Sequence, residues 1–148
     1  MKKTSSELLL LDVNVLLALA WPNHQFHGPA TRRLEKSSGR WATCALTQLG
    51  FIRLSSNPGA VSPARTPGDA ALLLAELVRD PAHVYLGALP APISAPSVTW
   101  TSVAGHRQVT DAYLLLLARR SGATFLTFDA RLKALAAGGD RLELLADL

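Results

Sequence analysis

Short apolar runs alternate along this chain with segments of helical spacing, and this alternation constrains the fold more than any other feature. The first run, residues 8–11, is continuously apolar, as expected for a central parallel strand that is buried on both faces. Strands and helices that alternate in this way predict an α/β fold with a mostly parallel sheet. The length of 148 residues fits one compact domain with a sizeable core.

The predicted elements follow from apolar spacing and from residues that start or stop helices. Strands are predicted at residues 8–11, 40–44, 84–89, 123–127 and, at an edge of the sheet, 142–145. Helices are predicted at residues 14–20, 29–36, 47–54, 68–79 and 130–137, and from residue 111 to a stop at Gly122. Thr47 and Thr110 are the expected N-caps of their helices. Residues 90–96, which contain three prolines, are expected to be a connection.

Three aspartates stand where a predicted strand and a predicted helix meet: Asp12, Asp111 and Asp129. Taken singly, each could be a helix cap or a turn residue. Their recurrence at separate junctions matters, because the carboxyl ends of neighbouring parallel strands converge on one crevice. Carboxylates gathered there repel one another, and a hard divalent cation relieves that repulsion. The set indicates a magnesium or manganese site and, with it, phosphoester chemistry.

The charge balance agrees with a polyanionic substrate. Fifteen Lys and Arg residues stand against eleven Asp and Glu residues, which gives a net charge of +4 and a pI near 9.7. Because three of the eleven acids are the aspartates above, the remaining surface is more basic than the total suggests. A basic surface around an acidic pocket suits a nucleic acid. The same modest basicity could also serve solubility alone.

Cysteine usage and the N-terminal sequence indicate the cytosol. Cys44 is the only cysteine, so the chain can form no internal disulfide. The basic N-terminus and the leucine-rich run after it imitate a secretory signal. Glu7, Asp12 and Asn14 interrupt that run, which is also too broken for a membrane span. We read it as a buried strand and the helix that follows.

Four sequence blocks, in order and over nearly the whole chain, resemble a PIN domain. More narrowly, they resemble a VapC-type toxin of a toxin–antitoxin pair. The blocks are residues 10–19, 47–58, 105–114 and 126–129. The resemblance implies a three-layer sandwich with helices on both sides of the sheet. It also implies a Mg²⁺- or Mn²⁺-dependent endoribonuclease that is controlled by a small cognate antitoxin and that is usually a homodimer.

The resemblance assigns roles to particular residues. The first metal-binding acid of the family falls on Asp12, the third on Asp111 and the fourth on Asp129. Asn14 and Thr127 resemble the polar residues that orient the ligands and bound water. Hydrolysis of RNA phosphodiester bonds at a metal site is the implied reaction.

One position departs from the family pattern. The second acid is commonly a glutamate where this chain has Gln48, whose oxygen can bind a metal or its water but brings no charge. We therefore expect weakened metal affinity rather than a dead enzyme. His106 and Arg107, just before the third acid, and Arg53 are candidates for contact with RNA phosphates.

Two other functions compete with this interpretation. A PIN fold impaired by Gln48 could bind RNA or a partner protein without cutting. Alternatively, the sequence that starts at Asp12 resembles the opening motif of haloacid dehalogenase-type phosphatases. In that case Asn14 would replace the general acid, and no lysine lies between Lys36 and Lys133 to fill the usual lysine role.

Overall fold

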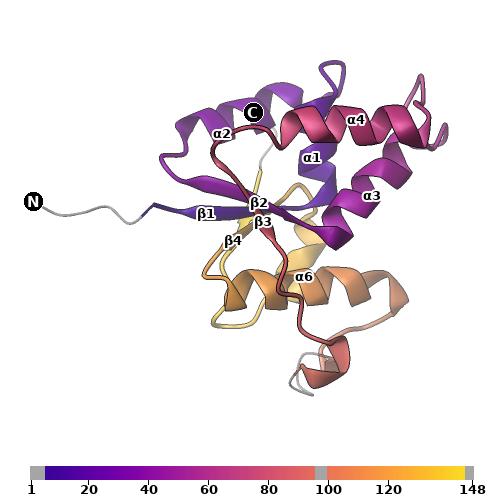
Figure 1. Ribbon diagram of the computed structural model, residues 1–148. Coiled ribbons are helices and arrows are strands. Elements are labelled where there is room, and N and C mark those ends of the chain that lie inside the picture. The colour runs from indigo at the N-terminus through magenta and orange to yellow at the C-terminus, as the bar shows by residue number, and fades with distance from the viewer. Residues whose placement is uncertain (1–5, 96–99, 146–148) are drawn as a thin grey trace, which may run out of the picture.

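The first strand of the chain lies at the centre of a parallel sheet (Figure 1). The computed structural model describes residues 6–95 and 100–145. Its strands are β1 (Leu8–Leu11), β2 (Arg40–Cys44), β3 (His83–Leu86), β4 (Thr124–Thr127) and β5 (Leu142–Leu144). They pair in the order β3-β2-β1-β4-β5, and every pairing is parallel. The predicted α/β class and the edge position of the last strand are confirmed.

Helices cover both faces of this sheet. On one face lie α1 (Val13–Ala20), α2 (His27–Lys36), α3 (Ala45–Ser55) and α4 (Pro67–Leu77), whereas α6 (Val109–Arg120) lies on the other (Figure 1). Short 3₁₀ turns form η1 (Pro92–Ser94), η2 (His106–Gln108) and η3 (Ala130–Ala134). The three-layer arrangement is therefore confirmed. No helix among residues 6–95 and 100–145 has both the length and the apolar character to cross a membrane.

The continuous apolar run is explained by its two buried faces. Successive side chains of a strand point to opposite faces. Leu9 and Leu11 accordingly pack into the core beneath α1, whereas Leu10 packs into the core beneath α6. All three are fully buried. Each such leucine contributes about 1.5–3 kcal/mol by leaving water, which holds β1 firmly between the layers.

The strand order creates a crevice between β1 and β4. The chain continues from β1 toward β2 and β3 on one side, whereas β4 and β5 fill the other side. Ligands of open α/β sheets bind where the strand order reverses, outside the carboxyl ends of the strands. The backbone N–H of Asp12 donates to the carbonyl of Leu126 over 2.9 Å, so the two strands stay paired up to this edge.

Two predicted helix caps are wrong. Helix α3 begins at Ala45 with Cys44 as its N-cap, and the Thr47 hydroxyl accepts the backbone N–H of Cys44 over 3.0 Å from inside the first turn. Helix α6 begins at Val109, because η2 runs directly into it, so Thr110 lies within the helix instead of capping it.

Most other differences concern element ends. Helix α1 begins one residue before the predicted 14–20 helix, because Asp12 caps it. The predicted 130–137 helix is the shorter 3₁₀ turn η3. The predicted stop after α6 is confirmed, since Gly122 has a φ of 66°, which a residue with a side chain rarely adopts. The predicted 90–96 connection contains η1, and its last residue lies outside the described residues.

Candidate metal centre

Asp12 is held rigidly at the end of β1. It is 8% exposed, and both of its carboxylate oxygens accept hydrogen bonds. Oδ1 accepts the backbone N–H of Val13 over 2.7 Å, and Oδ2 accepts the Thr127 hydroxyl over 2.7 Å. Burial raises the pKa of Asp12, these two hydrogen bonds oppose the rise, and the charge of Asp129 adds to it. The Asp12 carboxylate is therefore fixed in position but short of positive charge.

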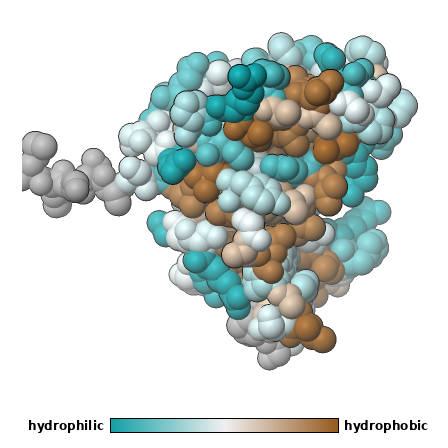
Figure 2. Space-filling view, viewed as in Figure 1, coloured by the Kyte–Doolittle hydropathy of each residue, from teal (hydrophilic) through white to brown (hydrophobic). Residues whose placement is uncertain are grey.

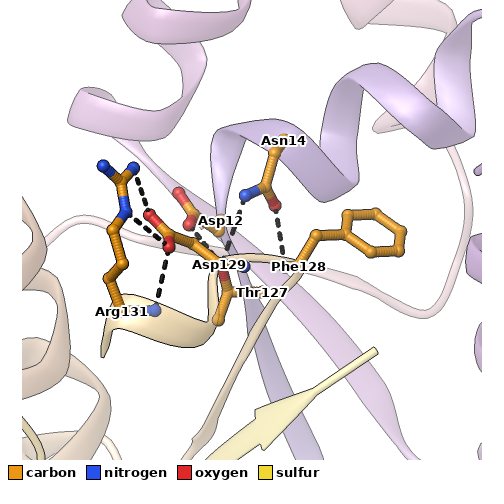
Figure 3. Close-up of polar contacts among 6 residues, drawn as sticks. All are labelled: Asp12, Asn14, Thr127, Phe128, Asp129 and Arg131. Carbon is orange, nitrogen blue, oxygen red and sulfur yellow. Dashed lines mark hydrogen bonds and ion pairs between the residues drawn. The ribbon is translucent and has the colours of Figure 1, made fainter. Parts of the chain in front are cut away.

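Thr127 and Asn14 connect the first helix to the end of β4 (Figure 3). The Thr127 hydroxyl donates to Asp12 and accepts both the Asn14 side-chain amide over 3.3 Å and the backbone N–H of Asp129 over 3.0 Å. The Asn14 oxygen in turn accepts the backbone N–H of Phe128 over 3.3 Å. Both side chains thus orient the turn that carries Asp129, which is the arrangement expected of groups that position metal ligands.

Asp111 carries the most perturbed carboxylate of the set. It lies in the first turn of α6 and is half-buried. Burial, followed by the negative charges of Asp12 and Asp129, raises its pKa to about 6, while Arg131 acts in the opposite direction. Within the part of the chain that the structure describes, its carboxylate has no hydrogen bond or ion pair. A partly desolvated carboxylate next to two others is electrostatically suited to a cation.

Asp129 differs from the other two because its charge is already paired. Its carboxylate caps η3 through the backbone N–H of Arg131 over 3.0 Å. The Arg131 guanidinium also donates to both carboxylate oxygens, over 2.9 and 2.8 Å (Figure 3). This hydrogen-bonded ion pair holds the pKa of Asp129 below its usual value.

The three aspartates form one electrostatic group, yet they are not arranged as a finished ligand set. Asp111 and Asp129 line the same cavity of about 160 Å³, and the charges of Asp12 and Asp129 both act on Asp111. Among the described residues, no three His, Cys, Asp or Glu side chains are grouped closely enough to hold a metal ion as they stand. One of the three, Asp129, faces Arg131 instead.

The donor set nevertheless fits a hard divalent cation. Every candidate ligand atom is a carboxylate oxygen, which Mg²⁺ and Mn²⁺ prefer. The raised pKa values of Asp12 and Asp111 show that their negative charges lack compensation. A cation bound among them would supply that compensation.

Gln48 makes a contact that the sequence did not indicate. It lies half-buried in α3, and its side-chain amide donates to the Thr43 hydroxyl over 3.0 Å. Thr43, fully buried at the end of β2, also lies 2.7 Å from Nε2 of His83 at the start of β3. Among the described residues the Gln48 oxygen accepts no hydrogen bond, and Gln48 does not line the cavity that Asp111 and Asp129 share.

The candidate phosphate contacts divide into two groups. His106 and Arg107 form the exposed turn η2 immediately before α6, and Arg107 lines the acidic cavity with Asp111. Arg53 is exposed in the last turn of α3 and is not part of that lining.

Arg131 is the site residue that the sequence analysis did not identify. Its signal was available: an arginine two residues after a predicted strand-end aspartate, where a turn can bring the two together.

Comparison with known proteins agrees with this fold and identifies the family of the chain. Residues 9–138 match the PIN domain family. The chain is 40% identical over 136 residues to ribonuclease VapC39 of Mycobacterium tuberculosis, covering 88% of this chain and 94% of that protein. It is also 40% identical over 130 residues to ribonuclease VapC38 of the same organism, covering 87% and 90%. The chain therefore belongs to the PIN-domain family, in its VapC group.

Solved structures share the fold at lower sequence identity. The crystal structure of VapC20 from M. tuberculosis, a toxin that cleaves the sarcin–ricin loop, has a TM-score of 0.62 at 16% identity over 90% of this chain and 98% of that chain. The structure of VapBC2 from Rickettsia felis bound to a promoter DNA fragment has a TM-score of 0.61 at 12% identity over 94% and 99%. Membership of the PIN family removes the support for the phosphatase alternative.

Proposed function

We propose that the protein is a single PIN domain over residues 1–148 that acts as the toxin of a toxin–antitoxin pair. Its proposed reaction is the hydrolysis of RNA phosphodiester bonds at a divalent metal site. The crevice beyond β1 and β4 carries this proposal, because Asp111 lies there half-buried beside the charges of Asp12 and Asp129. The identity to two M. tuberculosis ribonucleases supports the reaction class.

Asp12, Asp111 and Asp129 are the proposed ligands of Mg²⁺ or Mn²⁺. When bound, such an ion lowers the pKa of a water molecule and so provides a nucleophile for attack on phosphorus. Thr127 holds one oxygen of Asp12 in place, and the Asn14 amide holds the turn before Asp129. The proposed role of these two residues is to position the acids.

The basic residues next to the acids are the proposed RNA contacts. Arg107 lines the acidic cavity, and His106 precedes it in the same exposed turn. Both stand next to the N-terminus of α6, whose backbone N–H groups also favour an anion. Arg53 is proposed to meet the RNA farther along, at the end of α3.

Gln48 keeps the non-catalytic alternative open. It brings no charge to the position where the family commonly has an acid, and its amide is occupied by Thr43. A chain impaired in this way would still bind RNA or a partner. Cleavage that requires metal and is lost on Asp12→Asn separates the enzyme from the binder.

The proposed partners are a cognate antitoxin and a second copy of this chain. Structural neighbours include toxin–antitoxin complexes from R. felis and from Klebsiella pneumoniae. Apolar side chains reach the surface at several places on the face shown in Figure 2. An apolar cavity of about 400 Å³, lined by Leu46, Trp100, Val109 and Tyr113 among others, adjoins the N-terminus of α6. We assign this cavity, called the apolar groove below, to the second copy of the chain.

The cytosol is the proposed location, because Cys44 is an unpaired thiol.

Cleavage assays on purified protein test this function. We expect RNA to be cut with Mn²⁺ or Mg²⁺ and not with EDTA, and we expect Asp12→Asn and Asp111→Asn to abolish cutting while the fold is retained. Asp69→Asn is the matched control, since Asp69 is also an acid in the first turn of a helix but is exposed on α4, away from the acidic cavity. Expression of the wild type should arrest growth. If both site variants still arrest growth at equal expression, catalysis by these residues is not the cause.

A further inference from the structure

Among the described residues, Arg131 is the one cation that forms an ion pair with a proposed metal ligand. Its guanidinium donates to both oxygens of Asp129, and its own backbone N–H donates to the same carboxylate. The Arg131 side chain is 81% exposed, whereas that of Asp129 is 22% exposed. The pair therefore has a fixed inner partner and an outer partner that faces the solvent.

Arg131 influences more than its direct partner. It lines the cavity that Asp111 and Asp129 share. Its positive charge lowers the pKa of Asp129 directly and also opposes the rise of the pKa of Asp111. Where no metal is bound, the guanidinium is thus the counter-ion of the acidic group.

We propose that Arg131 couples RNA binding to metal binding by exchanging the Asp129 carboxylate for an RNA phosphate. This proposal rests on the function proposed above. Without RNA, Arg131 occupies Asp129 and competes with the metal for it. An incoming phosphate attracts the guanidinium outward, and Asp129 becomes available as a ligand. RNA and the divalent ion consequently bind with positive cooperativity.

The chemistry of the two partners favours this exchange. A guanidinium forms the same two-pronged hydrogen bonds with a phosphate as with a carboxylate. The guanidinium end of the pair is exposed, so it can turn outward toward a phosphate without crossing buried structure. Moreover, the backbone N–H of Arg131 can still cap Asp129 after the guanidinium leaves, so η3 need not unfold. Only a side chain has to move.

The neighbouring cations do not share this position. Arg107 lines the same cavity but forms no ion pair with an acid among the residues that the structure describes. Lys133 lies in η3, two residues after Arg131, and is exposed without lining the cavity. Lys133→Gln therefore removes one positive charge from the same short turn and leaves the Asp129 pair intact.

Two titrations test the coupling in the full chain. Calorimetry measures Mn²⁺ affinity in the wild type, Arg131→Gln and Lys133→Gln, with and without a random-sequence 2′-O-methyl oligonucleotide. Gel electrophoresis after each titration checks that the oligonucleotide is intact. Without it, Arg131→Gln should bind Mn²⁺ about two- to five-fold more tightly than the wild type, as expected when an exposed ion pair no longer competes. Fluorescence anisotropy should show weaker oligonucleotide binding to the same variant.

The oligonucleotide should tighten Mn²⁺ binding in the wild type and in Lys133→Gln, and clearly less in Arg131→Gln. Equal or weaker Mn²⁺ affinity in Arg131→Gln, or the same gain from the oligonucleotide as in Lys133→Gln, would overturn the exchange. In that case wild-type RNA cleavage and the loss of Mn²⁺ binding in Asp12→Asn would leave the proposed function standing. If Mn²⁺ binds the wild type and Asp12→Asn equally, the metal site fails and the exchange fails with it.

Discussion

The Thr127 hydroxyl donates to Oδ2 of Asp12 over 2.7 Å, joining residues that are 115 positions apart in the chain. Both side chains are buried, and Thr127 has no exposed surface. The same hydroxyl accepts the backbone N–H of Asp129, so one oxygen atom contacts two of the three acidic residues. The geometry of the acidic group thus depends on a residue outside the proposed ligand set.

Replacing Thr127 with valine should therefore damage both stability and the metal site. The change leaves the buried Asp12 carboxylate with one hydrogen bond fewer, and losing a bond to a charged group costs about 1.5–3 kcal/mol. Urea unfolding should show this loss, and calorimetry should show weaker Mn²⁺ binding. Thr124→Val, at the half-buried start of the same strand, is the control and should change neither by more than about 0.5 kcal/mol. Equal behaviour of the two variants would show that the hydroxyl is dispensable.

Asp111 should make the metal-free protein less stable as the pH rises. Its folded-state pKa, about 6, lies above the ordinary aspartate value of 3.8, so the folded protein holds this proton more tightly than the unfolded chain does. The contribution is favourable below pH 4 and is lost as the pH rises through 6. Asp111→Asn should remove this slope and stabilise the protein at pH 7 by about 1–2 kcal/mol, after allowance for solvent screening. Thermal unfolding of both proteins in EDTA from pH 4 to 8 measures the pH dependence and its loss in the variant.

The titration of Asp111 should give the Mn²⁺ affinity a pH dependence opposite in sign to that of the stability. Mn²⁺ requires the deprotonated carboxylate, so its affinity should increase as the pH rises through 6. Asp69→Asn, which changes an exposed acid in the first turn of α4, should leave both slopes as they are in the wild type. A stability difference between the wild type and Asp111→Asn that stays constant across this pH window would contradict the raised pKa of Asp111.

The sequence predicted the fold because its strongest signals are local. The apolar run of β1 and the aspartate that ends it follow from burial on both faces and from a helix start, which a short window of sequence contains. Helix caps were less predictable. Cys44, rather than Thr47, caps α3 because β2 remains paired with β3 as far as Cys44 and Leu86, and that pairing is not visible in the local sequence.

The contacts within the site could not be predicted from the local sequence for the same reason. The bond between Thr43 and His83 joins residues 40 positions apart, and it matters for Gln48 only once the sheet has formed. The pairing of Arg131 with Asp129 is local, yet it depends on how one side chain rotates in a folded turn. Residue types at strand ends therefore indicated which acids influence one another electrostatically, but not which of them would already have a partner.

The apolar groove beside α6 should mediate the proposed homodimer. Leu49 is 61% exposed on α3 and follows the groove residue Leu46 by one helical turn, while Val109 is exposed at the start of α6. Leu49→Glu or Val109→Glu should shift the protein toward a monomer in light scattering coupled to size exclusion. Leu72→Glu is the control, because Leu72 is just as exposed but lies on α4. A dimer that is insensitive to both Leu49→Glu and Val109→Glu would place the interface elsewhere.

Gln48→Glu should tighten Mg²⁺ binding and leave RNA cleavage unchanged or faster, whereas Gln48→Ala should lower both modestly. A fourth oxygen with a full charge strengthens a hard-cation site, while an amide offers only a dipole. Glutamate can no longer donate to Thr43. The Thr43 hydroxyl can donate to glutamate instead if Nε2 of His83 carries a proton and donates to Thr43, so the contact at 3.0 Å need not be lost. The counter-argument concerns the substrate, because a new carboxylate would repel RNA if this position faces a phosphate.

Magnesium titration by calorimetry, with cleavage assayed in parallel, separates the gain in metal affinity from the repulsion of RNA. Equal Mg²⁺ affinity in the wild type and in Gln48→Glu would put this position beyond the reach of the metal, and the metal role of Gln48 would have to be dropped.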